Sequence, residues 1–509
     1  MVEQVEQVER EDVRVLVIGT GFAGIAMAVA LREQGDDGQG VVLLERGEEV
    51  GGTWRDNTYP GAACDVPSQL YSLSFAPNPR WSHSFSRQPE IQDYLVRTAR
   101  EHAVSARTRF GTEVTGAQWD PQAQRWLVDA VHDGRPVGFR AQFLVSAVGA
   151  LSDPAYPRVD GLESFRGSMF HSSRWDHDHD LTGERVAVIG TGASAIQFVP
   201  QVQRVAGHLT VFQRTPPWVM PRTDRPLRAV EHAAYSRFPA VQRLARQAIY
   251  WGRETYAVGF TRRPGVLRVA ERIASWHLHR QVRDPALRAQ LTPDYAIGCK
   301  RILISNDYYP ALTQPNVSVQ TAAIRAVTPT GITTVDGVHH EVDTIVVGTG
   351  FQVTDMPMAR WLRDGAGRTL AELWAGRMRS HLGTTVAGLP NLFLLVGPNT
   401  GLGHSSQVFM IEQQVGYVAQ AIAATAARGA ATVEVREDVL AAYDAELVRR
   451  MAGTVWATGG CRSWYLDAEG HNTTLWPDFT FRFRSRLARF RPEEHVFAPA
   501  VVRPVTVGV

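Results

Sequence analysis

The chain of 509 residues is long enough for two or three domains. Hydrophobic residues make up 44% of it and charged residues 20%, a globular composition that excludes intrinsic disorder and collagen-like repeats. Its 53 Lys and Arg residues nearly balance its 51 Asp and Glu residues, and the net charge of +2 argues against a dedicated nucleic-acid-binding protein.

The three cysteines, Cys64, Cys299 and Cys461, lie far apart in the sequence. This spacing excludes a disulfide scaffold and a cysteine-based zinc site, and it fits a reducing compartment. The polar N-terminus lacks the apolar core of a secretory signal, and no run of 18 apolar residues is present that would span a membrane. The sequence therefore predicts a cytoplasmic protein without bound metal or integral membrane association.

A βαβ unit begins near the N-terminus. The apolar run at residues 13–18 predicts a buried strand, and a helix and a second strand ending at Glu45 come after it. The first turn carries the pattern GxGxxG, formed by Gly19, Gly21 and Gly24. In such a unit the glycines allow a tight turn, close approach of a pyrophosphate and close packing of helix on strand. The helix N-terminus binds the phosphates, and the acid accepts hydrogen bonds from a ribose.

The same pattern recurs later in the chain, where Gly190 and Gly192 come after a second buried strand. The unit closes on Gln213, Arg214 and Thr215 and carries no acid there. An acid at this point would repel a 2′-phosphate, whereas an arginine would pair with it. The second unit therefore favours NADP, while the alternative interpretation is a solvated surface arginine.

Two dinucleotide sites in one chain most often serve the reduction of a flavin by a nicotinamide. The first unit suits the free ribose hydroxyl of FAD or NAD, and the second suits NADP. Ser194 and Gln197 open the second helix, where they are positioned to donate hydrogen bonds to NADP. The predicted fold class is α/β, with two Rossmann-like dinucleotide-binding domains for FAD and NADP and a helical insertion.

The domains are expected to interleave along the chain. The FAD-binding domain combines residues 1–149 and 353–509, and the NADP-binding domain combines residues 150–221 and 301–352. Residues 222–300 form the helical insertion, because apolar residues recur there at helical spacing. A late helix begins after a glycine turn near residue 400, and its dipole would favour negative charge on a flavin.

The insertion is strongly basic. Between Arg222 and Arg301 there are 16 Lys or Arg residues and six acids, an excess of +10. This lobe would steer a polyanionic cofactor toward its site. A solvated helical face is an equal alternative, and a membrane-surface role is weaker because the acids are interspersed.

Three segments resemble signatures of the type I Baeyer–Villiger monooxygenases. The pattern FxGxxxHxxxW[P/D] is met by Phe165, Gly167, His171, Trp175 and Asp176. The pattern [A/G]GxWxxxx[F/Y]P[G/M]xxxD is met by Gly51, Gly52, Trp54, Tyr59, Pro60, Gly61 and Asp65. The pattern DxxxxATG[F/Y] is met at residues 343–351, with Gly348 where alanine is usual.

The resemblance also separates the chain from neighbouring families. Flavin-containing monooxygenases that oxidise nitrogen or sulfur carry a tyrosine where this chain has Trp175. Disulfide reductases place a cysteine pair after the Gly-Gly-Thr segment, where this chain has Trp54.

The resemblance implies an NADPH- and dioxygen-dependent oxidation of ketones to esters or lactones through a flavin peroxide. Arg301 resembles the catalytic arginine of the family, which would stabilise the negative peroxide and adduct without donating a proton. Asp65 matches the acid beside the flavin that orients this arginine, and Lys300 would contact the 2′-phosphate of NADP. The alternatives are an ordinary arginine at a helix end and a turn aspartate.

Further cofactor contacts are implied in the same way. The additional residues expected to contact FAD are Arg46, Gly52, Thr53, Trp54, Tyr71 and Val114. Trp54 and Tyr71 would flank the flavin and exclude water, unless they only pack in the core. His171 and Trp175 lie between the two units and are expected to couple domain motion to cofactor placement, without proton transfer.

The C-terminal region and the reaction class leave alternatives open. Trp464, Tyr465, Asn472 and Trp476 are expected to form either a lid on the ketone pocket or part of the first domain's core. The competing functions are a sulfide or amine oxygenase and a non-oxygenating NADPH-dependent flavoprotein reductase or redox sensor.

Overall fold

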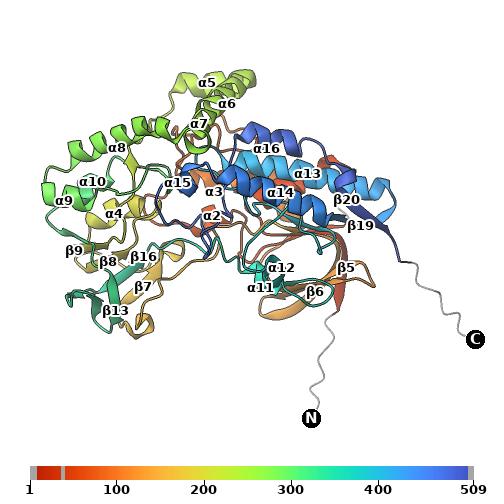
Figure 1. Cartoon of the computed structure of the whole chain (residues 1–509), viewed down its shortest axis with the longest axis horizontal. Coiled ribbons are helices and arrows are strands. Elements are labelled where there is room, and N and C mark those ends of the chain that lie inside the picture. The colour runs from red at the N-terminus through yellow and green to blue at the C-terminus, as the bar shows by residue number, and fades with distance from the viewer. Residues whose placement is uncertain (1–8, 36–39, 502–509) are drawn as a thin grey trace, which may run out of the picture.

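The computed structural model describes residues 9–35 and 40–501. It contains two main sheets, joined by long connections and bridged on one side by helices (Figure 1). The larger sheet has eight strands in the order β17-β4-β5-β6-β1-β2-β3, with β18 paired to β6. These strands are β1 (Arg10–Ile18), β2 (Val41–Leu44), β3 (Thr108–Arg109), β4 (Thr112–Asp120), β5 (Arg125–His132), β6 (Arg135–Ser146), β17 (Leu362–Arg363) and β18 (Leu392–Leu394).

The helices that accompany the larger sheet come from both ends of the chain. They are α1 (Phe22–Glu33), α2 (Thr53–Asp56), α3 (Gln88–Glu101), α11 (Met358–Trp361), α12 (Leu370–Trp374), α13 (Gln407–Ala427), α14 (Glu437–Met451), α15 (Val455–Thr458) and α16 (Thr480–Leu487). One of them, α15, packs against α7 (Tyr256–Thr261) of the insertion. The hairpin of β19 (Ala430–Val435) and β20 (His495–Pro499) closes the region.

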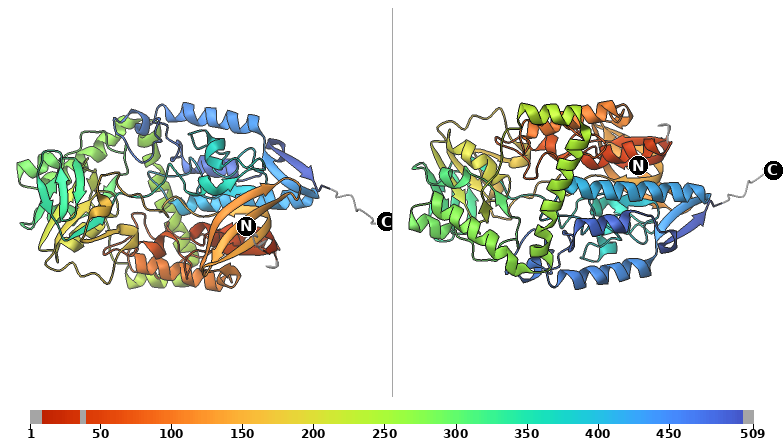
Figure 2. Two further views of the ribbon diagram at one scale, coloured as in Figure 1. Left: turned by 90° about the horizontal axis from the view of Figure 1, so that it is seen from below. Right: turned by 90° about the horizontal axis from the view of Figure 1, so that it is seen from above.

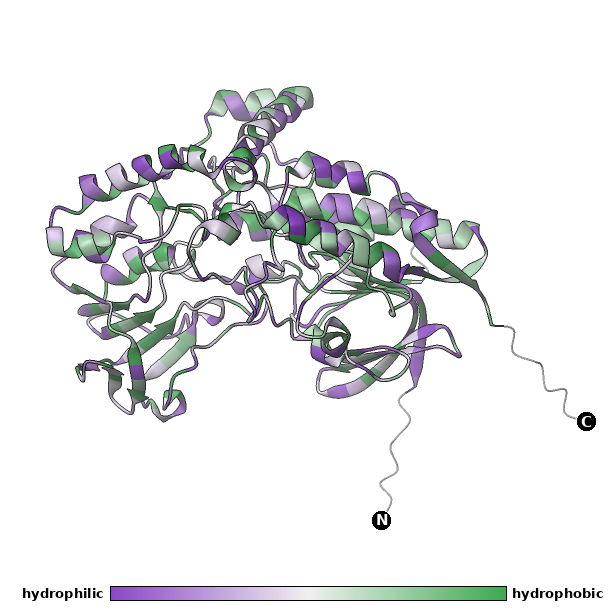
Figure 3. Ribbon diagram, viewed as in Figure 1, coloured by the Kyte–Doolittle hydropathy of each residue, from purple (hydrophilic) through white to green (hydrophobic). Residues whose placement is uncertain are grey.

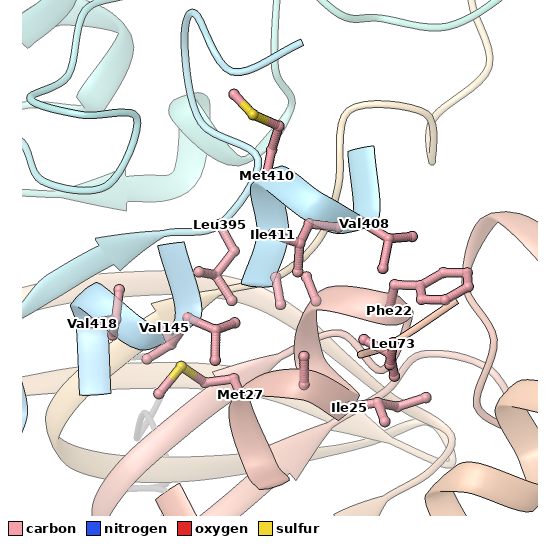
Figure 4. Close-up of a cluster of buried hydrophobic side chains, with 14 of the residues drawn as sticks. Phe22, Ile25, Met27, Leu73, Val145, Leu395, Val408, Met410, Ile411 and Val418 are labelled. Carbon is pink, nitrogen blue, oxygen red and sulfur yellow. The ribbon is translucent and has the colours of Figure 1, made fainter. Parts of the chain in front are cut away.

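One buried cluster ties these distant segments together. α1 packs along α13, and Figure 4 shows Phe22, Ile25 and Met27 of α1 among Val408 and Ile411 of α13. Each helix buries its apolar face against the other, although one lies near the start of the chain and the other near its end. The larger-sheet region is therefore complete only when both chain segments are folded.

The smaller main sheet is parallel throughout, in the order β12-β9-β8-β16-β7. Its strands are β7 (Ser168–His171), β8 (Arg185–Ile189), β9 (His208–Phe212), β12 (Val317–Gln320) and β16 (Thr344–Val347), with helices α4 (Ala195–Gln203) and α10 (Tyr308–Leu312). A three-stranded side sheet contains β13 (Ile324–Thr328), β14 (Gly331–Thr334) and β15 (His339–Glu341).

The two sheets carry the predicted repeat. β1 leads into Gly19, which has a φ of +98°, and β8 leads into Gly190, which has a φ of +113°. Both turns need a backbone conformation that residues with a Cβ rarely adopt. The expected α/β fold with two dinucleotide-binding units is confirmed.

The helical insertion leaves and rejoins the smaller sheet through a short parallel pair, β10 (Val219–Met220) and β11 (Leu303–Ile304). Its helices are α5 (Ala229–Arg237), α6 (Pro239–Glu254), α7 (Tyr256–Thr261), α8 (Arg268–Gln281) and α9 (Pro285–Gln290). The insertion also contains the 3₁₀ turn η4 (Pro264–Leu267). The 3₁₀ turns elsewhere in the chain are η1 (Ser105–Arg107), η2 (Leu162–Ser164), η3 (Ser172–Arg174) and η5 (Pro492–Glu494). The insertion bridges the two sheets along the upper edge of the molecule (Figures 1 and 2).

The cysteines correct one expectation. Cys299 and Cys461 form a disulfide across a sequence separation of 162, while Cys64 is free and buried. Distance along the chain does not prevent pairing, because the fold brings the end of the insertion against the segment that comes after α15. The wide cysteine spacing is therefore no argument for a reducing compartment. Within the described ranges, no helix is long and apolar enough to cross a membrane.

Candidate active site

The two nucleotide units meet along the loop that comes after α2. The amide of Gln197, on α4, accepts hydrogen bonds from Tyr59 Oη and Ala63 N, both at 3.1 Å, and donates to Ala63 O at 3.0 Å. The sequence places Gln197 at NADP, and in this structure its amide joins the second unit to the first. The loop is thereby held over the junction, and Asp65 lies at its end.

Asp65 and Arg301 form a bidentate ion pair at this junction. Arg301 Nε donates to Asp65 Oδ2 and Arg301 Nη2 to Oδ1, both at 2.7 Å. The Asp65 charge and its hydrogen bonds raise the pKa of Arg301. Burial alone would raise the pKa of Asp65, but the Arg301 charge lowers it below its usual value. Both groups therefore stay charged, and the fork geometry fixes the guanidinium plane.

A second cation, Arg253 of α6, lies close enough to interact with both members of this pair. Its Nε donates to His404 O at 2.6 Å, and burial lowers its pKa. Two guanidinium groups around Asp65 leave the site with a net positive charge. Arg253 was not identified from the sequence, because the basic excess of the insertion does not reveal which arginine points inward.

Aromatic rings and a neutral thiol surround the charges. Trp54 Nε1 donates to Tyr71 Oη at 3.0 Å, and their rings meet edge to face. The Tyr465 hydroxyl is buried and has no hydrogen-bond partner among the described residues. It lies close enough to Arg301 for the guanidinium charge to act on its pKa. Burial raises the pKa of the Cys64 thiol to about 12, so this cysteine is inert as a nucleophile.

The first unit has the features of a flavin-nucleotide site. A Cβ built on Gly52 would meet Gly21 Cα at 3.2 Å, so two glycines face one another at the α1 N-terminus. Three other residues that the sequence predicts to contact FAD lie around this unit. Val114 is half-buried on β4, and Thr53 is exposed at the start of α2. Arg46 donates a hydrogen bond to the Asp153 carboxylate at 3.0 Å. The bare backbone at the α1 N-terminus fits a pyrophosphate.

Glu45 is buried at the end of β2, where the sequence predicts the ribose contact. It accepts hydrogen bonds from Thr20 N and Oγ1, from Gly47 N and from Arg55 Nη1, at 2.6–3.0 Å. Burial alone would raise its pKa, but Arg55 and these donors lower it. Arg55 was not identified from the sequence, because it occupies a variable position of the signature.

Buried polar groups without partners mark the start of α13. His404 Nδ1, Ser405 Oγ, Ser406 Oγ and Gln407 Nε2 make no hydrogen bond with the described residues. Buried polar atoms are normally paired, so four such atoms in consecutive residues indicate the polar edge of a bound group. The hydrogen-bonding rim of a flavin fits this requirement, and the α13 N-terminus faces the same place.

The second unit presents two neighbouring cations. Gln213 is buried, Arg214 is exposed and Thr215 is half-buried after β9. Burial and then the Arg214 charge lower the pKa of Lys300, and Asp294 acts in the opposite direction. Lys300 also lies over the Tyr295 ring at 4.8 Å.

Adjacent cations of this kind fit a phosphate dianion, which would relieve the repulsion between Arg214 and Lys300. Gly192 and Ser194 come directly before α4, in the turn that opens this helix. The second unit therefore keeps the features of an NADP site that the sequence predicts.

The fingerprint residues lie in the segment that leads from the first unit into the second, which includes β7, the edge strand of the smaller sheet. His171 is buried between the rings of Tyr156 and Phe351, and burial lowers its pKa to about 4. Trp175 packs on Phe170 and Phe198. The remaining fingerprint residues lie in the same segment. Phe165 packs against the core, and the Cα of Gly167 lies so close to Asp343 O that a Cβ would not fit. Asp176 accepts a hydrogen bond from Asp178 N.

The C-terminal residues named from the sequence do not share one environment. Trp476 is in the core of the larger-sheet region, and Asn472 O accepts a hydrogen bond from Asn399 Nδ2 at 2.9 Å. Tyr465 lies at the Arg301 site, while Trp464 is 46% exposed. The disulfide from Cys461 to the residue before Lys300 anchors this segment beside the site.

Comparisons with known proteins agree with this geometry. A flavin-binding monooxygenase-like family model matches residues 12–250. A Baeyer–Villiger monooxygenase of Streptomyces coelicolor is 49% identical over 506 residues, covering 99% of this chain and 95% of that protein.

Two solved structures are similar along almost their whole length. An oxidised steroid monooxygenase bound to NADP has a TM-score of 0.83 and 32% identity, covering 96% of this chain and 99% of that one. A cyclohexanone monooxygenase with bound ε-caprolactone has a TM-score of 0.81 and 27% identity, covering 96% and 100%. On its sequence and its fold, the chain belongs to the Baeyer–Villiger monooxygenase family of flavin-binding enzymes.

Proposed function

We propose that this chain oxidises ketones to esters or lactones, using NADPH, dioxygen and bound FAD. The observation that carries the proposal is the bidentate Arg301–Asp65 pair at the junction of two nucleotide units. Bound FAD would supply the redox chemistry, taking a hydride from NADPH and activating dioxygen. The likeness to an ε-caprolactone-bound cyclohexanone monooxygenase supports a cyclic ketone as one substrate class.

The residues proposed to hold each cofactor are taken from the two units. For FAD they are Gly19, Gly21, Gly24, Glu45, Arg46, Gly52, Thr53, Trp54, Tyr71 and Val114. For NADP they are Gly190, Gly192, Ser194, Gln213, Arg214, Thr215 and Lys300, with Gln197 acting through the 59–63 loop.

Arg301 is proposed as the catalytic cation. Its raised pKa keeps it charged, so it stabilises negative charge on the substrate carbonyl oxygen without giving up a proton. Asp65 is proposed to hold the guanidinium plane in one orientation. Arg253 adds a second positive charge from the insertion and strengthens the field at the same point.

Trp54, Tyr71 and Tyr465 are proposed to exclude water from the site. Trp54 and Tyr71 support one another through a hydrogen bond at 3.0 Å, and burial raises the pKa of Tyr71. Tyr465 remains neutral near Arg301, because burial raises its pKa to about 12. A dry site strengthens the interaction between Arg301 and the developing charge.

We propose the domain division that the sequence predicts. Residues 1–149 and 353–509 form the FAD-binding domain, and residues 150–221 and 301–352 form the NADP-binding domain. Residues 222–300 form the insertion that brings Arg253 to the junction. The partners are a small ketone and dioxygen, and the proposed location is the cytoplasm, where NADPH is regenerated.

The test combines product analysis with one substitution. Holoenzyme with NADPH is given cyclic and linear ketones and a sulfide under ¹⁸O₂, and products are identified by mass spectrometry. We expect esters or lactones with one labelled oxygen. Arg301→Ala should lower ester formation by about 100-fold or more, because one stabilising donor at a developing oxyanion is worth roughly that factor. Flavin reduction by NADPH should remain measurable.

Three outcomes would contradict the proposal. Full ester formation by Arg301→Ala would remove Arg301 from the chemistry. Sulfoxide as the sole product would favour a heteroatom oxygenase. Hydrogen peroxide as the sole product across the panel would favour a reductase or redox sensor. Arg360→Ala, which breaks an exposed arginine–aspartate pair with Asp355, is the matched control and should keep full activity.

A further inference from the structure

For its length, the helical insertion exposes far more large hydrophobic side chains than the rest of the protein. Of the 20 large hydrophobic side chains that are exposed among the described residues, ten lie in the insertion, although it is much the smaller part of the chain. They are Val230, Phe238, Val241, Leu244, Trp251, Tyr256, Val266, Val269, Ile273 and Trp276. Apolar patches of this kind, bordered by charge, mark binding surfaces.

Helix α6 buries two polar side chains and exposes large apolar ones. It exposes Leu244 to 69% and Trp251 to 55%, whereas Gln242 and Glu254 are almost fully buried. Gln242 Nε2 donates to Gln69 Oε1 and to a backbone carbonyl, both at 2.7 Å. Polar side chains of α6, together with Tyr250, therefore attach the helix to the protein, while Leu244 and Trp251 are left toward solvent.

Helix α8 buries Ala274 and Leu278, but it and the turn before it also expose apolar side chains. Val266, Val269, Ile273 and Trp276 are spaced by three or four residues, so they form one stripe, and all are at least 40% exposed. In Figure 1 the helices α5, α6 and α8 lie along the upper edge of the molecule, and Figure 2 looks onto them from above. Hydrophobic positions recur along these helices in Figure 3.

Arginines border both stripes. The exposed ones on α5, α6 and α8 are Arg237, Arg243, Arg268, Arg272 and Arg280. The acids of α5 and α6 do not neutralise them, because both are turned to other partners. Glu254 is buried against His404 and Thr480, and Glu231 pairs with Arg225.

Glu271 of α8 is the remaining acid on these three helices. A single carboxylate against five exposed arginines leaves the face strongly positive. Of the interspersed acids that weaken a membrane-surface role in the sequence, Glu231 and Glu254 are thus withdrawn from this face by the fold.

An open surface cavity of about 740 Å³, lined by arginines, adjoins the apolar face. Arg262, Arg449, Arg450 and Arg482 line it together with Glu446. Beneath them the buried Asp478 accepts hydrogen bonds from Arg262 at 3.0 Å, from Arg450 at 2.5 Å and from Arg482 at 3.3 Å. Four guanidinium groups against two carboxylates leave an excess of positive charge that fits a phosphate.

The cavity and the apolar face are continuous. Phe481, the residue before Arg482, lies with its ring centroid 6.0 Å from that of Trp251 on α6. Apolar and aromatic side chains therefore lead directly into a cationic pocket. This is the order of chemistry met at a bilayer surface, where acyl chains adjoin phosphate headgroups.

We propose that the insertion face docks on a bilayer that contains anionic phospholipids. Its Trp and aliphatic side chains enter the acyl boundary, its arginines pair with headgroup phosphates, and the arginine-lined cavity receives one such phosphate. A second copy of the chain fits less well, since a twofold contact would bring the same arginine-rich face against itself. The proposal is independent of the oxygenation chemistry.

The test measures binding of the FAD-loaded enzyme to vesicles by co-sedimentation and by tryptophan emission. We expect binding to vesicles that mix phosphatidylcholine with phosphatidylglycerol, a blue shift, and weaker binding as salt rises. Leu244→Ser with Trp251→Ser should reduce binding at least tenfold. Arg243→Gln with Arg272→Gln should also reduce binding to anionic vesicles at least tenfold, because each arginine near such a surface contributes about 1 kcal/mol to binding.

The control is Val335→Ser with Val338→Ser, which removes equally exposed valines from the β14–β15 turn and should leave binding unchanged. FAD content and NADPH-dependent flavin reduction should match the wild type in all three double variants, which shows that each is folded. No vesicle binding by the wild type would overturn the proposal. So would a dimer in light scattering that the Leu244 and Trp251 substitutions convert to a monomer.

Discussion

The two nucleotide units share one turn and differ in the residues that close them. Gly19 and Gly190 both adopt positive φ directly after a parallel strand. The first unit closes on a buried acid, Glu45, held by Arg55, whereas the second closes on the exposed cation Arg214 beside Lys300. The glycine turn therefore specifies a dinucleotide, and the residue after the second strand specifies which one.

The two units also differ in how far their charged side chains are exposed to solvent. In the first unit the charge is enclosed and already paired, so it acts on the ligand through oriented hydrogen bonds. In the second unit two cations repel one another, and Arg214 is accessible, so they attract an incoming phosphate. This contrast fits one cofactor that stays bound and another that exchanges with solvent.

The largest effect is expected for Glu45→Gln. The substitution removes one of the two carboxylates that pair with the Arg55 guanidinium, which is 18% exposed, and leaves it only Asp56. Breaking a buried ion pair on one side costs about 3 kcal/mol of unfolding free energy, and FAD should be lost on dialysis. The measurements are urea denaturation and the ratio of flavin to protein absorbance. Glu48→Gln, at an exposed position of the same loop, is the matched control. Retention of FAD by Glu45→Gln would show that the buried charge of Glu45 does not hold the cofactor in the first unit.

A smaller effect is expected for Arg214→Ala. Loss of a charge-assisted phosphate contact should cost about 2 kcal/mol, or roughly 30-fold in kcat/KM for NADPH, with little change for NADH. Steady-state kinetics with both cofactors measures the ratio. Arg204→Ala, exposed at the far end of α4, should change neither value. An equal loss for both cofactors would mean that Arg214 does not recognise the 2′-phosphate.

The smallest effect concerns His171, at the end of β7. Burial lowers its pKa to about 4, so the unfolded chain binds a proton near pH 6 that the folded chain does not. This contribution to stability is present above about pH 6.5 and is lost as the pH falls toward 4. We expect a loss of about 1 kcal/mol between pH 7 and 5.5, which His171→Asn should abolish. Parallel urea curves at the two pH values measure it, and identical pH dependence in the two proteins would exclude the effect.

The sequence predicts the parts of this molecule that depend on local pattern. The repeat at Gly19 and Gly190 and the helical insertion are indicated by short-range spacing, and both are present. The pairing of Asp65 with Arg301 was predicted from the family resemblance and not from spacing, since 236 residues separate the two.

Features that depend on long-range packing were not predicted. The orientation of α6 decides that Arg253 points to the junction while Leu244 faces solvent, and periodicity alone does not say which face a helix buries. For the same reason the bond between the Gln197 amide and the loop at Ala63 could not be foreseen from the sequence.

The bond between Cys299 and Cys461 ties the covalent structure beside the site to how the protein is prepared. It joins the residue before Lys300 and Arg301 to the segment that carries Tyr465. Material made in a thiol-rich host and material folded in an oxidising one would be two chemical species with a single sequence. Turnover rates of this enzyme are therefore comparable between laboratories only when the content of free thiols is stated with them.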